Sequence, residues 1–198
     1  MLFFVQVKIS CVYSIERKGG NILQNHLKEV IDLYGDYLLR IAYTYVKDKR
    51  IAEEILQDVI FAYYRKQDEY REEASLKTYL TKITINRCYD HLRSWKNKRE
   101  LAFEKIFVIG RTKSAEKRSI EKEEKMEITR AVFSLKVKLR EVILLYYYAE
   151  HTTKEIAGLL NTPESTIKSR LQKARILLRE ELQHYEWEVL MHETREIF

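Results

Sequence analysis

Only one proline and five glycines occur in the 198 residues of this chain. β-Hairpins, βα loops and phosphate-binding loops depend on these residue types, because glycine supplies positive φ angles and proline presets a turn. The composition therefore argues against a β-sandwich, a barrel or a glycine-rich nucleotide-binding fold. Hydrophobic residues make up 45% of the chain and charged residues 33%, which suffices for packed cores with a soluble surface. An all-α fold is the prediction.

Apolar residues in the first half of the chain recur at three- and four-residue steps, as in amphipathic helices. The first such stripe comprises Leu27, Val30, Ile31, Tyr34, Leu38, Ile41, Ala42 and Tyr45. The second comprises Ala52, Ile55, Leu56, Val59, Ile60 and Tyr63. A third helix, capped by Ser75, is predicted to carry Leu76, Leu80, Ile83 and Leu92. Residues 24–98 should therefore form a small helical domain.

The two ends and the middle of the chain differ from these periodic blocks. Residues 1–23 have no helical period and contain two adjacent glycines, so they are predicted to be a disordered or loosely packed extension. They lack the basic leader and cleavage motif of a signal peptide. Residues 99–127 are predicted to be a charged linker. A second helical domain should occupy 128–198, with one stripe formed by Leu135, Leu139, Val142, Ile143 and Tyr146 and a last helix from Pro163 to about Leu190.

Residues 151–182 have the pattern of a helix-turn-helix. Thr152 or Thr153 is predicted to cap a short helix whose start Glu155 supports electrostatically. The buried face of that helix should be Ile156, Ala157, Leu159 and Leu160. The Asn-Thr-Pro sequence that follows ends it, with Thr162 as the N-cap of a second helix and Pro163 at its first position. The second helix should bury Ile167, Leu171, Ala174 and Leu178.

The second helix of this motif is strongly basic. Residues 164–179 contain five basic side chains and one acidic, a local charge of +4 that suits contact with phosphates. A recognition helix reads base edges in the major groove with such residues. The predicted DNA contacts are Ser165, Thr166, Lys168, Ser169, Arg170, Gln172, Lys173 and Arg175. An ordinary αα-hairpin with a solvated basic face is the alternative.

A second basic segment lies at 76–99, which contains seven basic residues and one acidic residue, an aspartate. Aromatic residues alternate with these cations, a combination that holds unstacked bases. On the helix before it, Glu53, Glu54, Gln57 and Asp58 share a polar face beside apolar residues. That face is either solvated or a docking surface for a partner helix.

Enzymatic chemistry finds no support in the sequence. Cys11 and Cys88 are far apart, the five histidines are scattered, and no phosphate-binding loop occurs. We therefore predict no catalytic residue, no metal site, no cofactor and no small-molecule substrate.

Three blocks, taken in order, resemble bacterial sigma factors. Residues 42–64 contain an Asp followed by Ala-Glu-Glu-Ile-Leu-Gln-Asp-Val, which is similar to the family's polymerase-binding segment. Residues 75–95 are similar to its promoter-melting segment, with Thr-Tyr-Leu where a Thr-Trp-Leu is usual. Residues 139–182 resemble its −35-reading domain, although Leu135-Lys136, just before this block, lacks the proline often found there. With two domains only, the chain looks like the extracytoplasmic-function (ECF) subfamily.

The resemblance implies a function and a set of contacts. The chain should bind RNA polymerase core, through its β′ subunit, with Asp48, Glu53, Glu54, Gln57 and Asp58. It should hold the −10 element of promoter DNA with Tyr79, Lys82, Asn86, Arg87, Asp90, Arg93 and Trp95, while the segment 65–75 captures a flipped base. The resemblance also implies a cytoplasmic location and an anti-sigma factor, in many cases membrane-bound. The alternative function is a helix-turn-helix repressor or activator that acts alone as a dimer on duplex DNA.

Overall fold

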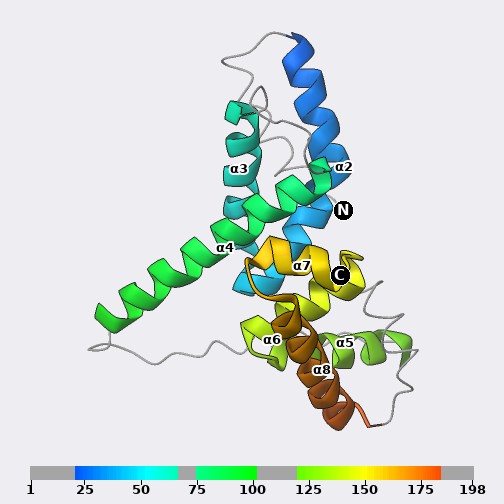
Figure 1. Cartoon of the computed structure of the whole chain (residues 1–198). Coiled ribbons are helices and arrows are strands. Elements are labelled where there is room, and N and C mark those ends of the chain that lie inside the picture. The colour runs from blue at the N-terminus through cyan, green and yellow to red at the C-terminus, as the bar shows by residue number, and fades with distance from the viewer. Residues whose placement is uncertain (1–20, 67–74, 102–119, 184–198) are drawn as a thin grey trace. The chain divides into compact units, whose positions relative to one another are not determined.

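The computed structural model describes residues 21–66, 75–101 and 120–183, and every regular element within these ranges is helical. In chain order the elements are α2 (Asn21–Val46), α3 (Lys49–Lys66), α4 (Leu76–Leu101), α5 (Ile120–Ser134), α6 (Val137–Ile143), the π-helix η2 (Leu144–Tyr148), α7 (Thr153–Leu160) and α8 (Glu164–Glu181) (Figure 1). The chain divides into two compact units, Met1–Asp90 and His91–Phe198. The prediction of an all-α fold is confirmed. Within the described ranges, none of the helices has the length and apolarity that a membrane span requires.

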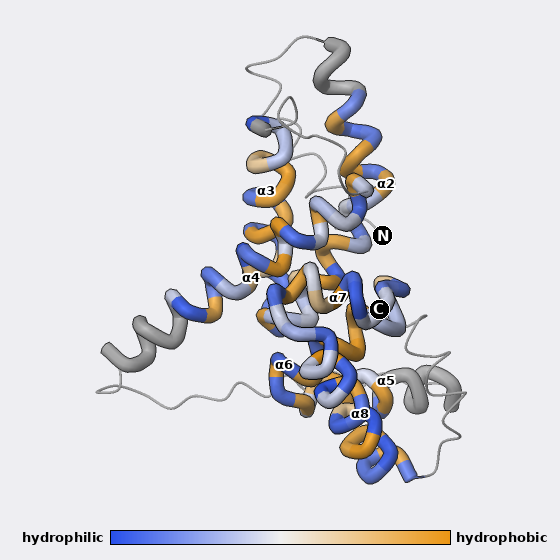
Figure 2. Tube along the Cα trace, in the orientation of Figure 1, coloured by the Kyte–Doolittle hydropathy of each residue, from blue (hydrophilic) through white to orange (hydrophobic). Residues whose placement is uncertain are grey.

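Helices α2 and α3 form the core of the first unit, and Figure 2 shows hydrophobic residues recurring along both. All six residues of the stripe predicted on α3 are buried, and on α2 every predicted residue except Tyr34 is buried. The turn between them places Lys47 at φ 58°, and its N–H donates to the carbonyl of Tyr43 at 2.8 Å. Asp48 then caps α3, because its Oδ1 accepts from the Ile51 N–H at 3.0 Å.

Helix α4 begins as predicted but buries a different face. The hydroxyl of Ser75 accepts from the Thr78 N–H at 3.2 Å, which caps the helix. Of the predicted stripe only Leu80 is buried, and Leu76, Ile83 and Leu92 are partly exposed. The buried face consists of Leu80, Thr81, Thr84, Ile85 and Cys88.

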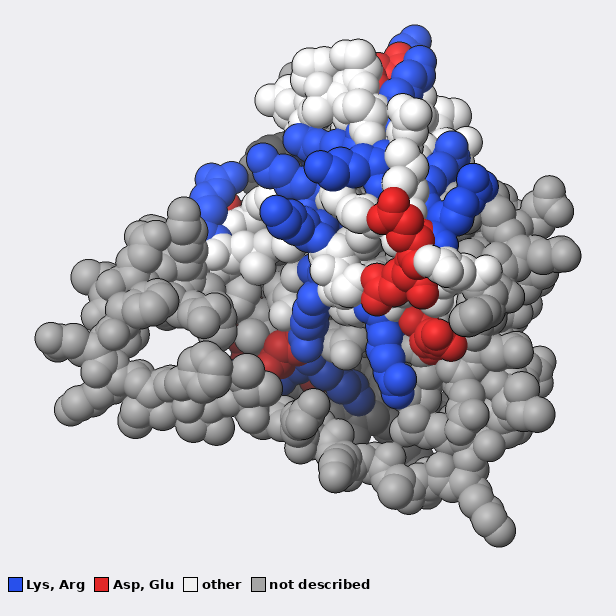
Figure 3. Space-filling view, turned by 90° about the horizontal axis from the view of Figure 1, so that it is seen from below, with Lys and Arg blue, Asp and Glu red and all other residues white. Residues whose placement is uncertain are grey.

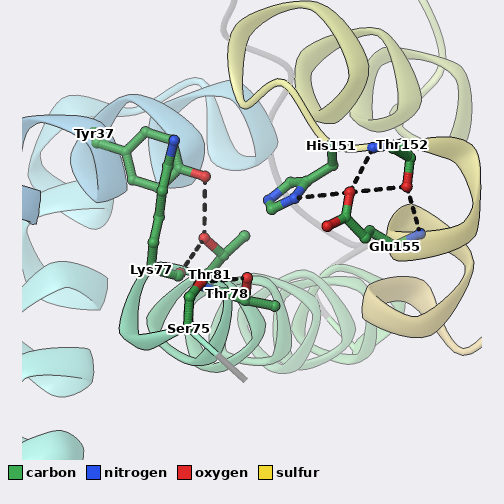
Figure 4. Close-up of polar contacts among 8 residues, drawn as sticks. All are labelled: Tyr37, Ser75, Lys77, Thr78, Thr81, His151, Thr152 and Glu155. Atoms are coloured by element: carbon green, nitrogen blue, oxygen red, sulfur yellow. Dashed lines mark hydrogen bonds and ion pairs between the residues drawn. The ribbon is translucent and has the colours of Figure 1, made fainter. Parts of the chain in front are cut away.

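Two threonines explain this difference. Thr84 donates its hydroxyl to the carbonyl of Leu80 at 2.9 Å, and Thr81 donates to Lys77 at 2.7 Å. Thr81 also lies 3.1 Å from the hydroxyl of Tyr37 on α2 (Figure 4). Once hydrogen-bonded, these polar side chains fit in the core, so an apolar pattern alone does not locate the buried face.

The second unit departs from the predicted single stripe over 135–146. Helix α5 starts at Ile120, earlier than the predicted start near Ile128, and ends at Ser134. The buried Arg140 donates to the carbonyls of Phe133 at 3.1 Å and Leu135 at 3.0 Å. It thereby satisfies carbonyls at the end of α5, which stabilises the break between α5 and α6. Helix α6 then runs directly into η2.

Several predictions concern the ends of elements. Residues 21–23, which were predicted to belong to the N-terminal extension, form the start of α2, and residues 1–20 lie outside the described ranges. The last helix was predicted to continue to about Leu190, but α8 ends at Glu181 with Leu182 as its C-cap. Residues 67–74 of the predicted base-capturing segment, like residues 184–190, are not among those described.

Candidate nucleic-acid interface

Helices α7 and α8 pack on each other as a helix-turn-helix. Ile156 and Leu159 are buried on α7, and α8, which packs against both α7 and α6, buries an inner row that consists of Ile167, Leu171, Ala174 and Leu178. The turn uses Asn161 in the left-handed conformation, at φ 48° and ψ 51°, as the C-cap of α7. The N–H of Thr162 then donates to the carbonyl of Ala157 at 3.0 Å. A rigid turn of this kind fixes the direction of α8.

Of the two predicted caps, Thr152 is the N-cap of α7, and it forms a capping box with Glu155 (Figure 4). The Glu155 N–H donates to the Thr152 hydroxyl at 3.2 Å, and the Thr152 N–H donates to the Glu155 carboxylate at 2.7 Å. The Thr152 hydroxyl also donates to that carboxylate, at 2.8 Å. The hydrogen bonds that the Thr152 N–H and hydroxyl donate lower the pKa of Glu155, since they favour the ionised carboxylate.

The start of α8 corrects the predicted cap. Pro163 is the N-cap, and its carbonyl accepts from the N–H groups of Thr166 at 2.9 Å and Ile167 at 3.1 Å. Thr162 does not cap α8, because its hydroxyl donates back to the carbonyl of Leu160 at 3.1 Å. The first residue of α8, Glu164, accepts from the Thr153 hydroxyl at 2.7 Å and so connects the two helix starts.

The predicted DNA contacts on α8 fall into two groups. Five of them are exposed on the side away from the inner row, namely Ser165, Lys168, Ser169, Gln172 and Lys173, and Thr166 is partly exposed beside them. Lys168 lies 3.0 Å from the carboxylate of Glu164. Hydrogen bonds from Thr153 and then Lys168 lower the pKa of Glu164. On the face shown in Figure 3, Lys and Arg cover more of the described surface than Asp and Glu.

The other two predicted contacts, Arg170 and Arg175, engage side chains of their own unit. Arg170 lies 3.5 Å from the buried carboxylate of Glu141. The Nε of Arg175 donates to the Tyr147 hydroxyl at 2.8 Å, and its guanidinium lies over the rings of Tyr146 and Tyr147. Burial raises the pKa of Tyr147, and the charge of Arg175 partly offsets this. Both arginines therefore fix α8 onto the helices before it.

On α4 the predicted −10 residues share one side of the helix. Asn86, Arg87, Asp90 and Arg93 are exposed and Tyr79 and Lys82 are partly exposed, all opposite the buried Thr84 and Cys88. The side chain of Trp95 is not among those described. Lys77, one turn before Thr81 of the buried face, lies with its ammonium 4.6 Å from the Tyr37 ring centroid.

On α3 the predicted polymerase-binding residues also share one side. Glu54 and Asp58 are exposed, and Glu53 and Gln57 are partly exposed beside them. Phe61, one turn further on, is 52% exposed, and the Arg65 guanidinium lies 5.9 Å from its ring centroid. An acidic row that ends in an exposed aromatic ring has the chemistry of a docking surface.

Comparisons with known proteins match both units. Residues 30–99 match the model of sigma-70 region 2, and residues 125–178 match that of sigma-70 region 4. The ECF RNA polymerase sigma factor SigW of Bacillus subtilis is 27% identical over 168 residues, which is 80% of this chain and 90% of that protein. The chain belongs to the ECF group of sigma factors.

A second curated relative and two solved structures are also similar to this chain. An ECF sigma factor SigM of Mycobacterium tuberculosis is 26% identical over 170 residues, with 82% of this chain and 84% of that protein covered. The sigma factor RpoE of Bartonella quintana, solved with the anti-sigma factor NepR, has the same fold, with a TM-score of 0.65, 24% identity and coverage of 79% and 96%. CnrH, solved with the cytosolic domain of CnrY, gives a TM-score of 0.58 at 16% identity and coverage of 91% and 99%.

The structure of this sigma factor adds residues that the sequence did not identify. Phe61 belongs to none of the predicted sites, and its exposure distinguishes it from the buried Tyr63. Ile176 and Leu177 on α8 are 51% and 36% exposed, although neither fits the polar row of predicted contacts. Among the described residues, no group of three or more His, Cys, Asp or Glu is arranged to hold a metal ion.

Proposed function

We propose that this sigma factor binds RNA polymerase core through α3 and reads promoter DNA through α4 and α8. The observation that carries the proposal is the separation of three chemically distinct exposed rows on three helices. The row on α3 is acidic and ends in an aromatic ring. The row on α4 contains an amide, an aspartate and arginines, and the row on α8 contains lysines and hydroxyl groups. A factor that holds a protein partner and two DNA elements at once needs three such surfaces.

The acidic row on α3 suits a helical, basic surface of the polymerase, for which the β′ subunit is our proposed partner. Asp48 also caps α3, so its contribution to that surface includes holding the helix start. Polar contacts would come from Glu53, Glu54, Gln57 and Asp58. Phe61 would add an aromatic anchor that becomes buried when the polymerase binds.

The row on α4 suits an unstacked strand at the −10 element. Tyr79, partly exposed, offers a ring for stacking, and Asn86 offers donors and acceptors to a base edge. Arg87 and Arg93 would contact the backbone phosphates. Trp95 and Lys82 complete the proposed set, with Asp90 in the same row.

The row on α8 suits the −35 element. Ser165, Thr166, Ser169 and Gln172 carry the hydroxyls and amide that read base edges, and Lys173 suits a phosphate or a guanine. We assign Arg170 and Arg175 a supporting role, because each is already bound within the unit.

The rest of the proposal follows from these surfaces. Residues 24–98 and 128–198 would act as the polymerase/−10 and −35 domains, with 99–127 as the linker between them and 1–23 as an extension. Each domain binds weakly alone, and tethering both on the polymerase raises the effective concentration of the second contact. The factor would act in the cytoplasm as a binding protein rather than an enzyme, and an anti-sigma factor would cover its surfaces until a signal arrives.

A pair of variants tests the division of roles. Lys173→Ala should weaken binding to −35 DNA and reduce the salt slope by about one unit, since one phosphate contact is lost, while polymerase affinity stays unchanged. Asp58→Lys should weaken polymerase binding and leave binding to −35 DNA unchanged. Both side chains are exposed, so folding should not change in either variant. If both variants lowered the same activity while remaining folded, the assignment of surfaces would be wrong.

A further inference from the structure

A groove of about 940 Å³ lies in the second unit between α8 and the segment that joins α5 to α6. Its apolar lining comes from Leu135, Val137, Leu139 and Leu177, and most of its exposed surface is apolar. Leu177 is 36% exposed on this side. The polar row proposed to read DNA does not account for this apolar surface.

Basic side chains surround the apolar lining. Lys136, Lys138 and Lys173 line the groove together with Arg170. The three lysines are exposed, and none of them forms an ion pair with an acidic side chain in the part of the chain that the structure describes. A ligand that fits this groove therefore combines apolar side chains with negative charge.

The chain itself supplies such a segment next to the groove. Glu180 and Glu181, at the end of α8, line one end of the groove, and the described structure stops two residues later at Gln183. Residues 184–198 contain four glutamates and one arginine, a net charge of −3. They also contain Trp187, Leu190 and Met191, whose spacing is that of one helix face.

The length of this segment also fits. The α8 side of the groove runs from Arg170 to Glu181, about 16 Å at the helical rise of 1.5 Å per residue. Fifteen residues span about 22 Å as a helix and more when extended, so the segment can double back along the whole groove.

We propose that residues 184–198 dock in this groove and compete with −35 DNA for Lys173. The apolar residues would cover Leu139 and Leu177, and the glutamates would lie among the unpaired lysines. The competition rests on the proposed role of α8, whereas the docking does not. Binding of the factor to polymerase or promoter would displace the segment, so free factor would bind duplex DNA more weakly than its recognition helix allows.

Disulfide formation in the full chain tests the docking. In a Cys11→Ser background, Leu177→Cys is combined with Leu190→Cys, and Ile176→Cys with Leu190→Cys serves as the matched control. Ile176 is the neighbouring residue and more exposed, but it does not line the groove. Cys88 can remain, because burial raises the pKa of its thiol and leaves it unreactive.

We expect the Leu177/Leu190 pair to form an intramolecular disulfide at least about fivefold faster than the control, because docking raises the local concentration of the two thiols. Equal rates would overturn the docking. A faster reaction that yields covalent dimers instead would make the groove an interface between two copies and would also overturn it.

A second arm tests the competition. Scrambling residues 184–198 keeps their charge but removes the apolar spacing, and should raise affinity for a labelled promoter duplex about threefold or more. An unchanged affinity, with the wild-type chain binding the duplex, would overturn the competition. If neither chain bound the duplex alone but core polymerase carrying either chain did, the competition would be overturned and the proposed −35 role would stand. If no binding were seen with polymerase either, the −35 role would fail, and the disulfide arm would still decide the docking.

Discussion

The packing of α8 on α7 predicts a large difference between two isoleucines of the same helix. Ile167 is fully buried in the inner row, whereas Ile176 is 51% exposed. Replacement by Ala removes three carbon atoms from each, worth roughly 2.4 kcal/mol of transfer free energy when fully buried. At Ile167 a cavity adds to this loss, so Ile167→Ala should destabilise the second unit by about 3 kcal/mol. At Ile176 about half the transfer term applies, and the gain in helix propensity offsets part of it, leaving under about 1 kcal/mol.

Amide hydrogen exchange of the full chain, followed by mass spectrometry, measures this difference locally. Peptides from α7 and α8 should open at least about 30-fold more often in Ile167→Ala than in Ile176→Ala, the equivalent of roughly 2 kcal/mol. Peptides from α2 and α3, which belong to the other unit, serve as the internal control and should not change. Equal loss of protection in both variants would refute the packing of α8 through its inner row.

Three further predictions concern the proposed surfaces and the cap of α7. Phe61→Ala should lower polymerase affinity by about 1–2 kcal/mol without unfolding, whereas Leu33→Ala, at a residue 70% exposed on α2, should not; equal effects would exclude an anchor at Phe61. Tyr79→Ala should reduce open-complex formation, seen by permanganate reactivity, by about 1–3 kcal/mol, and Tyr79→Phe should restore it if stacking is the role. The folded pKa of Glu155 lies below the ordinary glutamate value, so its stabilising effect is present above that value and is lost as the pH falls through the folded pKa. The urea midpoints of wild type and Glu155→Gln should therefore differ most near pH 7 and converge in acid; a constant difference would contradict the sign of the shift.

The helices that the sequence predicted best are those whose buried face is purely apolar. On α3 every residue of the predicted stripe is buried, and Thr152, one of the two predicted caps, is the N-cap of α7. On α4 the prediction was wrong for three of four residues, because Thr81 and Thr84 enter the core by bonding to helical carbonyls. Hydrophobic periodicity carries no signal for a buried polar residue that is satisfied locally.

Features of the candidate interface that lie on a single helix were predictable from the sequence, whereas features formed by contact between two helices were not. The exposed row of α8 follows from helical spacing once the inner row is known. The break at Ser134 depends on Arg140 reaching back to the end of α5, a contact between segments that no periodicity reveals. Likewise, the groove beside Leu177 exists only because α8 packs against the start of α6.

Transcription in vitro from a promoter library, with purified core polymerase and with or without this protein, tests the central claim most directly. The account predicts start sites that appear only when the protein is present and that lie downstream of paired −35 and −10 motifs. Asp58→Lys, at the exposed face of α3, should abolish those starts. The absence of any protein-dependent start, together with binding of the protein alone to two-fold symmetric duplex sites, would contradict the account.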